Sequence, residues 1–370
     1  MNRMHGRVLA APLAALLTAF SACGDAPAQQ GPEAGRMATT SPQTSEIRPG
    51  ALSRGLDSTL LESTIEAAET LPRLRSMIVL RDGEEEFAAT FNDGAPLDQP
   101  VNIKSASKSV LSALAGIAIE RGVLEGTDQP ILSELADLAP AAPDPRLAQV
   151  TVGHLLSMQA GLERTSGEYY GAWVASPNWV RYALARPFVD EPGGRMLYST
   201  GSSHLLSAML TRASGRSTHA LAQDWLAEPL GIRLPPWPRD PQGIYFGGND
   251  MLMSPRALSR FGELYRLGGV LNGEQLLPAS WVEESWTPRA RSPWSGNAYG
   301  YGWFLTDMAG HPVRFAWGYG GQMLYIVPSL ALTVAMTSDP SAPSDIGHIR
   351  ALHDLVSEGL VPAAEAGATG

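Results

Sequence analysis

An apolar run from Val110 to Ile119 constrains this chain most strongly, because a segment of this composition must be buried when the chain folds. The run ends at Arg121-Gly122, and a basic residue followed by glycine is typical of a helix C-terminus. Directly before the run stands the polar stretch Asn102-Ile103-Lys104-Ser105-Ala106-Ser107-Lys108-Ser109. We therefore expect a buried helix from Ser105 onward that carries polar side chains at its N-terminus.

Both lysines of the chain lie in this polar stretch, although the sequence has 27 lysines and arginines in all. Arginine stays protonated in proteins, whereas a desolvated lysine can lose its proton and act as a base. Ser105 and Lys108 are three residues apart, so on a helix they share a face and can form a hydrogen bond. This spacing predicts a serine nucleophile with a lysine partner, at a helix end that favours negative charge. An exposed helix start with solvated lysines is the alternative, and we expect Lys104, which precedes the helix, to be solvated in either case.

Composition excludes several classes of protein. With 44% hydrophobic and 17% charged residues, the 370-residue chain is typical of a folded protein of one large domain or two smaller ones. A net charge of −10 without a basic stripe argues against a nucleic-acid partner. A single cysteine, Cys23, excludes an internal disulfide and a cysteine-built metal site. No apolar run reaches the roughly 18 residues that a membrane span requires.

The N-terminus predicts export. Residues 1–22 have the pattern of a secretory signal, with Arg3 and Arg7 ahead of an apolar segment too short to span a bilayer. Phe20-Ser21-Ala22-Cys23 resembles the lipobox of bacterial lipoproteins, with Phe where Leu is usual, so Cys23 is the predicted lipidation site and only membrane anchor. Ordinary cleavage after a small residue is the alternative. We expect a periplasmic or membrane-anchored lipoprotein, or otherwise a secreted protein, with residues 23–50 as a disordered tether.

The folded region is predicted to span residues 51–362, with a disordered tail at 363–370. We expect its sheet from residues 51–100 and 290–362, and helices over most of 110–285. A helix at Leu56–Leu71 should precede a hairpin of Ser76–Leu80 and Glu86–Phe91, turned by Asp82-Gly83. Further helices are expected at Thr151–Met158, Leu205–Ala213, Pro255–Leu267 and Ser344–Glu358. Later strands are expected at Gly300–Leu305, Val313–Trp317, Gln322–Val327 and Ala331–Thr337.

Tyr198 lies in a loop of small residues after a Pro-Gly-Gly turn. Near Lys108, its phenolate would be stabilised by the ammonium group, which makes Tyr198 a candidate general base. A half-buried tyrosine at a loop edge is the alternative. Another aromatic group, which includes Tyr170, is expected in a loop at Glu168–Trp173, either lining a pocket or packing under the loop. His154, in contrast, is expected to be structural.

A second glycine-rich stretch, Trp317-Gly318-Tyr319-Gly320-Gly321-Gln322, falls between two predicted strands. Glycines there let a ligand approach the backbone, and free N–H groups at a strand edge can donate to an oxyanion. A glycine bulge in a twisted sheet is the alternative. The sequence has no motif of two other hydrolase classes: it contains neither the G-x-S-x-G elbow of many Ser-His-Asp hydrolases nor an H-E-x-x-H metal motif.

Together these stretches resemble the serine β-lactamase and D,D-peptidase superfamily, and most closely its class C-related hydrolases, which include family VIII esterases and aminohexanoate-dimer hydrolases. The resemblance covers about residues 52–340, with the motifs in the family's order: Ser105-Ala106-Ser107-Lys108, Tyr198-Ser199-Thr200 and Tyr319-Gly320-Gly321-Gln322. It implies an α/β (α+β) fold of the β-lactamase/transpeptidase type, with an antiparallel sheet flanked by helices and an all-helical subdomain. No cofactor is implied, and no oligomeric state follows.

The resemblance also implies roles. Ser105 would be the acylated nucleophile, and Lys108 and Tyr198 would share the proton transfers, with Tyr198 as the base in both acylation and deacylation. The Ser105 N–H would form half of an oxyanion hole, completed at Gln322 or, under a shifted alignment, at Gly320. The remaining residues predicted to bind substrate are Tyr319, Gly321 and Thr200 in these motifs, and Tyr170 in the aromatic stretch.

Two departures from the family pattern affect the expected substrate. Thr200 stands where lactamases usually have Asn, and Tyr319 stands where they have the Lys that helps to bind a β-lactam carboxylate. A lost buried charge partner costs roughly 2–5 kcal/mol. We therefore expect an esterase or amidase for a small-molecule substrate, with weak or no β-lactamase activity. The alternatives are a D,D-carboxypeptidase or β-lactamase acting on peptidoglycan-type substrates, and a non-catalytic envelope-binding protein of the same fold.

Overall fold

The computed structural model describes residues 55–341 and 345–367. Its strands are β1 Leu74–Arg81, β2 Glu84–Thr90, β3 Val101–Asn102, β4 Leu252–Met253, β5 Val270–Leu271, β6 Glu274–Gln275, β7 Ala290–Arg291, β8 Ala298–Tyr299, β9 Phe304–Met308, β10 His311–Gly318, β11 Gln322–Val327 and β12 Leu332–Ser338. Its helices are α1 Ser58–Glu69, α2 Ser107–Glu120, α3 Leu132–Leu135, α4 Val152–Leu156, α5 Tyr170–Val174, α6 Trp179–Leu184, α7 Thr200–Ser214, α8 Thr218–Ala222, α9 Glu228–Leu230, α10 Pro255–Arg266, α11 Ala279–Ser285, α12 Ile346–Asp354 and α13 Val361–Gly367.

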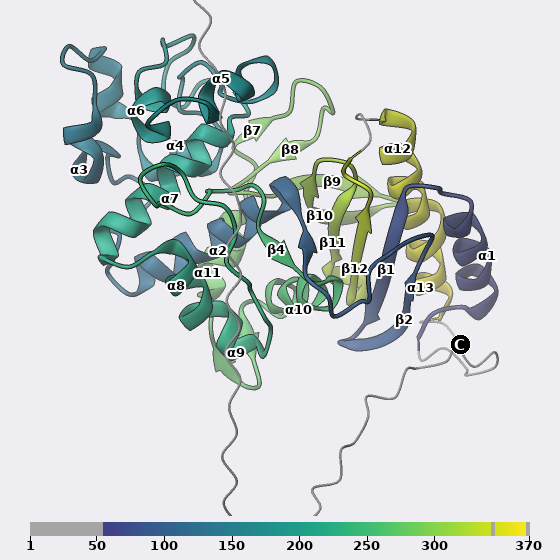
Figure 1. Ribbon diagram of the computed structural model, residues 1–370. Coiled ribbons are helices and arrows are strands. Elements are labelled where there is room, and N and C mark those ends of the chain that lie inside the picture. The colour runs from purple at the N-terminus through teal and green to yellow at the C-terminus, as the bar shows by residue number, and fades with distance from the viewer. Residues whose placement is uncertain (1–54, 342–344, 368–370) are drawn as a thin grey trace, which may run out of the picture. The chain divides into compact units, whose positions relative to one another are not determined.

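The centre of the structure is an eight-stranded sheet in the order β2-β1-β12-β11-β10-β9-β8-β7 (Figure 1). Every neighbouring pair in it is antiparallel. The early hairpin β1-β2 joins the sheet through β12, so the first and last strands of the folded region pair with each other. This topology, with helices on both faces, confirms the predicted fold class.

The sheet separates two hydrophobic cores because side chains alternate along each strand. In β11, Leu324 and Ile326 point into the core shared with α2 and α10, whereas Met323 and Tyr325 point into the other core. That second core is closed by α1, α12 and α13, which gather on one side of the sheet in Figure 1. Both faces of β11 and β12 are buried, which explains why these strands do not alternate between apolar and polar residues in the sequence.

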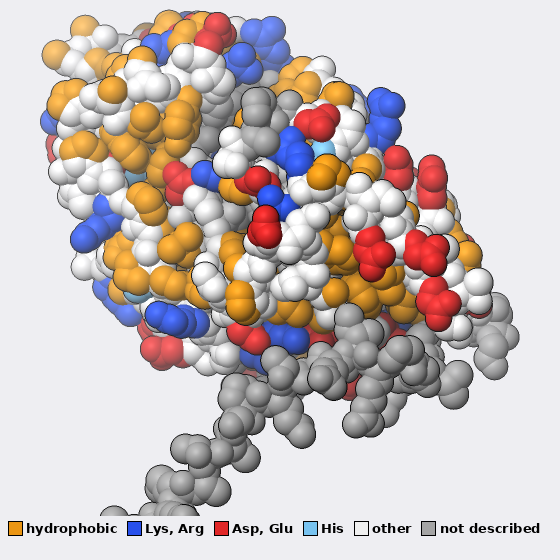
Figure 2. Space-filling view, turned by 45° about the vertical axis from the view of Figure 1, so that its right-hand side comes forward, with side chains coloured by type: hydrophobic (Ala, Val, Ile, Leu, Met, Phe, Trp, Pro, Cys, Tyr) orange, Lys and Arg blue, Asp and Glu red, His pale blue; other side chains and the backbone are white. Residues whose placement is uncertain are grey.

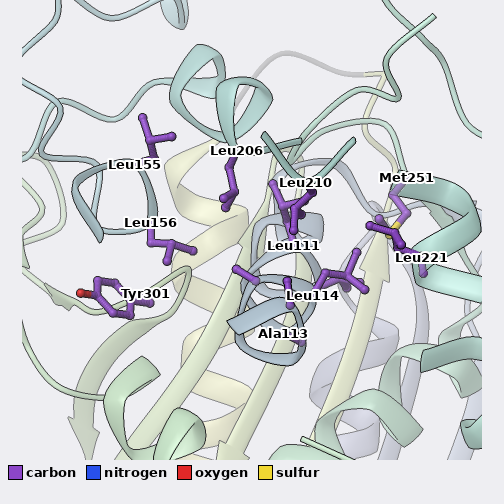
Figure 3. Packing of buried hydrophobic residues seen from close by; sticks show 14 of the residues in the cluster. Leu111, Ala113, Leu114, Leu155, Leu156, Leu206, Leu210, Leu221, Met251 and Tyr301 are labelled. Carbon is purple, nitrogen blue, oxygen red and sulfur yellow. The ribbon is translucent and has the colours of Figure 1, made fainter. Parts of the chain in front are cut away.

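Helix α2 is the hub of the larger core, as the apolar run predicts. Leu111, Ala113 and Leu114 of α2 lie among leucines of α4, α7 and α8 (Figure 3). Gly116 permits the closest contact, because an added Cβ would lie 2.3 Å from the Trp281 ring on α11. A helix so enclosed is a rigid support for the polar residues at its N-terminus.

Most predicted elements are found within a few residues of their predicted bounds, and three are wrong. Of the strand expected at Gly300–Leu305, only Phe304 and Leu305 lie in a strand, β9; residues 300–303 form the turn between β8 and β9, in which Gly302 has a positive φ of 80°. The aromatic stretch expected as a loop is a short helical turn followed by α5. The tail expected from residue 363 is helical as far as Gly367, and Ala363 and Ala364 are buried in the second core. The predicted signal segment, the predicted tether and Cys23 lie outside the described residues.

The surface of the described region is mixed in character. Figure 2 shows acidic, basic and apolar side chains interspersed over the face turned to the viewer. Within residues 55–341 and 345–367, no helix combines the length and apolar character needed to cross a membrane.

Candidate active site

Ser105 lies in a single turn of 3₁₀-helix, Lys104–Ala106, directly before α2. Its Oγ is 3.0 Å from Lys108 Nζ, so the predicted pairing of these side chains is present. The end of β10 packs closely on this turn: a Cβ at Gly318 would lie 2.3 Å from the Ile103 carbonyl oxygen and 3.2 Å from the Ala106 nitrogen. Glycine at 318 therefore lets the sheet edge approach the backbone that carries Ser105.

Lys108 is buried, with 4% of its surface exposed. Its Nζ donates to the Gly248 carbonyl at 2.7 Å and lies 3.4 Å from Thr200 Oγ1. Burial away from water lowers the pKa of Lys108 to about 7, against a smaller opposing effect of the Asp250 charge. At neutral pH a large fraction of Lys108 is therefore a neutral amine.

Tyr198 meets Lys108 through its ring face, with Lys108 Nζ 4.9 Å from the ring centroid. Burial raises the pKa of Tyr198 to about 12, and a hydrogen bond with Ser105 opposes this only in part. The expected stabilisation of the phenolate by Lys108 is thus wrong for the resting site. The structure keeps Tyr198 protonated and leaves Lys108 as the group that can accept a proton.

Lys104 is held in an ion pair rather than freely solvated as expected, although its side chain remains 26% exposed. Its Nζ forms an ion pair with Asp250 Oδ1 at 2.9 Å, and the same oxygen accepts from Asn102 Nδ2 at 2.7 Å. The backbone of Lys104 has a positive φ of 49°, a conformation that non-glycine residues rarely adopt. The two lysines therefore point to different partners.

Thr200 also differs from its predicted role. Its side chain is buried and contacts Lys108 Nζ and Ser166 Oγ, the latter at 3.1 Å, rather than facing open space. Ser166 Oγ in turn accepts from the Thr200 N–H at 2.9 Å. Thr200 thus holds Lys108 in place at the start of α7.

The glycine-rich stretch forms the turn between β10 and β11. Tyr319 and Gly320 line a cavity together with Ser105. Gln322, in contrast, begins β11, pairs with Gly318 and buries its amide against the Ser338 backbone. Gly321 packs towards Leu352 and His348 on the far side of the turn. Of the two alternatives for completing the oxyanion hole, Gly320 lines the cavity with Ser105, whereas Gln322 does not.

Tyr170 lies behind the site and does not line the cavity. From α5, its hydroxyl oxygen accepts from Asn249 Nδ2 at 3.0 Å, and its ring stacks on Phe246. Burial raises the pKa of Tyr170 to about 12. The residue supports the 246–250 segment, which provides the Gly248 carbonyl. His154 is structural, as predicted, because it forms a capping box with Thr151 at the start of α4.

The cavity above Ser105 has a volume of about 180 Å³, and its walls are mostly aromatic. The walls are formed by Tyr198, Trp294, Phe304, Trp317 and Ile349. A neighbouring cavity of about 450 Å³ shares Trp294, Trp317 and Ile349 with it. Trp294, 49% exposed, stands edge-on to the Tyr198 ring with 5.5 Å between ring centroids. A further cavity of about 290 Å³ under α1 has no Ser-Lys pair and no part in this site.

Sequence reasoning missed several of these residues. Trp294, Phe304 and Ile349 come from a hairpin tip, a strand and a helix that no local motif connects to Ser105. Gly248 and Asp250 could have been suspected, since they stand in a glycine-rich turn. Among the described residues, no three His, Cys, Asp or Glu side chains gather where they could hold a metal ion.

A comparison with protein families matches residues 75–356 to the family described as Beta-lactamase. The chain belongs to the Beta-lactamase family. This membership makes it a β-lactamase-fold hydrolase by descent, and it confirms the resemblance drawn from the three motifs. None of the curated protein sequences matches the chain.

Solved structures support the fold. A Bacillus anthracis protein described as a 6-aminohexanoate-dimer hydrolase is 20% identical, with a TM-score of 0.66 over 83% of this chain and 81% of that one. An octameric penicillin-binding protein homologue from Pyrococcus abyssi is 21% identical, with a TM-score of 0.64 over 80% and 76% of the two chains. EstCE1, a hydrolase with promiscuous acyltransferase activity, is 17% identical, with a TM-score of 0.64 over 81% and 97%.

Proposed function

We propose that this protein is a serine hydrolase that forms an acyl-enzyme through Ser105 and cleaves a small ester or amide. The observation that carries the proposal is the set of partners around Lys108 Nζ. A neutral amine has two N–H donors and one lone pair. The Gly248 carbonyl can only accept, and Thr200 Oγ1 can accept the second N–H. The lone pair is then left for the hydroxyl proton of Ser105, 3.0 Å away.

Acylation follows from this geometry. Neutral Lys108 takes the Ser105 proton as Oγ bonds to the substrate carbonyl carbon, and negative charge develops on the carbonyl oxygen. Ser105, in the turn before α2, and Tyr319, on the turn between β10 and β11, both line the cavity, and we assign their backbone N–H groups as the donors to that charge. No partner within the described residues takes up the Tyr319 N–H. This donor stands one residue from the Gly320 predicted under the shifted alignment.

Tyr198 completes the proton balance. As the tetrahedral intermediate collapses, the leaving group takes the Tyr198 proton and departs, which leaves a phenolate beside the Lys108 ammonium. In deacylation, water attacks the acyl carbonyl carbon and gives its proton to that phenolate. Ser105 Oγ leaves and takes back its proton from Lys108. The resting protonation states are restored, and the phenolate exists only while Lys108 is charged.

The cavity walls point to the substrate class. The residues that line the 180 Å³ cavity include no lysine or arginine. A β-lactam carboxylate would have no cation in this cavity, at a cost of roughly 2–5 kcal/mol relative to a paired carboxylate. Esters or amides with short, uncharged acyl groups fit its volume and its aromatic walls. Among solved structures of this fold, EstCE1 is described as a hydrolase with promiscuous acyltransferase activity, and a Streptomyces protein as a D-stereospecific amidohydrolase.

Labelling with a fluorophosphonate probe tests the proposal and separates it from a non-catalytic binder. We expect the wild-type protein to be labelled and to hydrolyse p-nitrophenyl acetate and butyrate, and Ser105→Ala to lose both properties. Ser107→Ala is the matched control, because Ser107 Oγ donates to the Lys104 carbonyl and does not contact Lys108. An unlabelled, folded wild-type protein would support the binder instead. Nitrocefin turnover as fast as that of the short esters would refute the proposed substrate class.

A further inference from the structure

A histidine and an aspartate are buried together beneath Lys108, in a part of the fold where apolar residues would be expected. His204 on α7 is fully buried, and its Nε2 is 3.1 Å from Asp240 Oδ2. The other Asp240 oxygen, Oδ1, accepts the N–H groups of Gln242 and Ile244 at 2.9 and 2.8 Å. His204 Nδ1 lies 3.3 Å from the Gly247 nitrogen.

These contacts determine the tautomer of His204. A backbone N–H can only donate, so His204 Nδ1 must carry a lone pair towards Gly247. The ring proton is then on Nε2 and is donated to the Asp240 carboxylate. Asp240 therefore orients the imidazole and selects its tautomer, as a carboxylate does for histidines in many functional sites.

The segment that His204 holds is the one that contacts Lys108. Gly247 is followed by Gly248, whose carbonyl accepts from Lys108 Nζ at 2.7 Å. Both glycines are tightly enclosed: a Cβ at Gly247 would lie 2.2 Å from the Ser203 carbonyl oxygen, and one at Gly248 would lie 2.6 Å from Lys108 Cγ. Because the two residues are adjacent in this tightly packed segment, a shift of Gly247 would also move the Gly248 carbonyl relative to Lys108.

We propose that His204 and Asp240 are positioning residues, which hold the Gly248 carbonyl against Lys108 and so direct the amine lone pair at Ser105. This inference rests on the proposed function, because it assigns a support to the proposed base. A contribution to stability alone is a poor explanation of the pair. The His204 ring is surrounded by Trp173, Trp179 and Phe246, and buried polar pairs are often no more stabilising than apolar residues of the same volume.

The decisive variant is Asp240→Asn, which hardly changes the volume. The amide oxygen would remain with the two backbone N–H groups, so the amide nitrogen would face His204 Nε2. Nε2 must then accept a hydrogen bond from the amide, so the ring proton moves to Nδ1. The Nδ1–H group would point at the Gly247 N–H, and the two donors would repel each other. We expect kcat for p-nitrophenyl butyrate to fall by about 10- to 100-fold with KM nearly unchanged, because misplacing a catalytic group has effects of this size.

Nitrogen-15 NMR of labelled histidine reports the tautomer directly, independently of activity. We expect His204 to be protonated at Nε2 in the wild type and at Nδ1 in Asp240→Asn. His204→Phe, which keeps an aromatic ring but no hydrogen bond, should lose kcat to a similar extent. His204→Gln, which has an acceptor and a donor, should recover part of it. If His204→Phe fails to fold, Asp240→Asn and His204→Gln still decide the question.

His219→Phe is the matched control. This histidine also packs against aromatic rings and donates to a backbone carbonyl, that of Leu234, but it has no contact with Gly247 or Gly248. A folded Asp240→Asn protein with wild-type kcat, or one that loses kcat and gains KM together, would overturn the inference. The proposed function fails in a different way: the wild-type protein itself would not be labelled at Ser105.

Discussion

Replacing Lys108 with methionine should abolish hydrolysis and change the pH dependence of stability in a calculable way. Methionine has nearly the shape of lysine but cannot be charged, so the buried site no longer has to desolvate an ammonium group. In the wild type, burial lowers the pKa of Lys108 from 10.5 to about 7. In the unfolded chain the lysine recovers its ordinary pKa. The difference couples folding to the binding of one proton.

The sign and size follow from that coupling. Between pH 7 and pH 10.5 the unfolded chain holds a proton that the folded protein has released, so wild-type stability rises with pH in this range. The stabilising contribution is complete above about pH 10.5 and is lost as the pH falls towards 7. At 1.36 kcal/mol per pH unit, the full effect is about 5 kcal/mol, of which about 2–3 kcal/mol appears between pH 6 and pH 9.

The assay is urea denaturation of the wild type and Lys108→Met at several pH values, with the difference in unfolding free energy plotted against pH. Taking the difference between the two unfolding free energies removes the contributions of all titrating groups that behave alike in both proteins. We expect the wild type to gain about 2–3 kcal/mol on the variant from pH 6 to pH 9. A flat difference would refute the reasoning, since it would mean that Lys108 keeps an ordinary pKa in the folded protein. Ser107→Ala should show no such pH dependence.

Three further predictions follow from the site. The value of kcat/KM should rise with pH through about 7, because Lys108 must be neutral to act as the base. Lys104→Met should shift this rise to higher pH, because an unpaired Asp250 carboxylate raises the pKa of Lys108 more strongly. A pH-rate profile of both proteins measures the shift, and identical profiles would contradict the prediction. Trp294→Ala should open the shared wall of the two cavities and raise kcat/KM for p-nitrophenyl octanoate relative to butyrate, whereas an unchanged chain-length profile would exclude Trp294 as a limit on the acyl group. Gly318→Ala should lower the free energy of unfolding by about 1–3 kcal/mol and slow fluorophosphonate labelling, because its Cβ would clash with the Ile103 carbonyl oxygen. Thermal denaturation and labelling time courses measure the two effects, and Gly171→Ala, at an open position, is the control.

The parts of the fold that local patterns encode were predictable. The β1-β2 hairpin follows from Asp82-Gly83, which adopts positive φ angles of 51° and 85° at the turn. Helix α10 follows from its amphipathic pattern and from Ser254, which caps it ahead of a proline. The strand expected at Gly300–Leu305 was wrong because aromatic and glycine residues there looked like one strand, while the Gly302 turn divides them.

The candidate site was predictable only where its residues are local in sequence. Ser105 and Lys108 share one turn, so their contact follows from spacing alone. The protonation of Tyr198 does not, because it depends on how deeply the side chain is buried after two distant segments have packed together. The support from His204 was equally hidden, since its partners at 240 and 247 become neighbours only through the packing of α7.

The two lysines of the opening stretch have opposite electrostatic roles. Lys104 pairs with Asp250, the acid whose charge raises the pKa of Lys108. Lys104 supplies the counter-charge to that carboxylate, and burial outweighs the effect of Asp250 on the pKa of Lys108. An arginine at 108 would stay protonated in the same surroundings and could not accept the Ser105 proton. Acid-base chemistry thus explains why position 108 carries a lysine rather than an arginine, whereas at position 104 the side chain supplies a positive charge that pairs with Asp250.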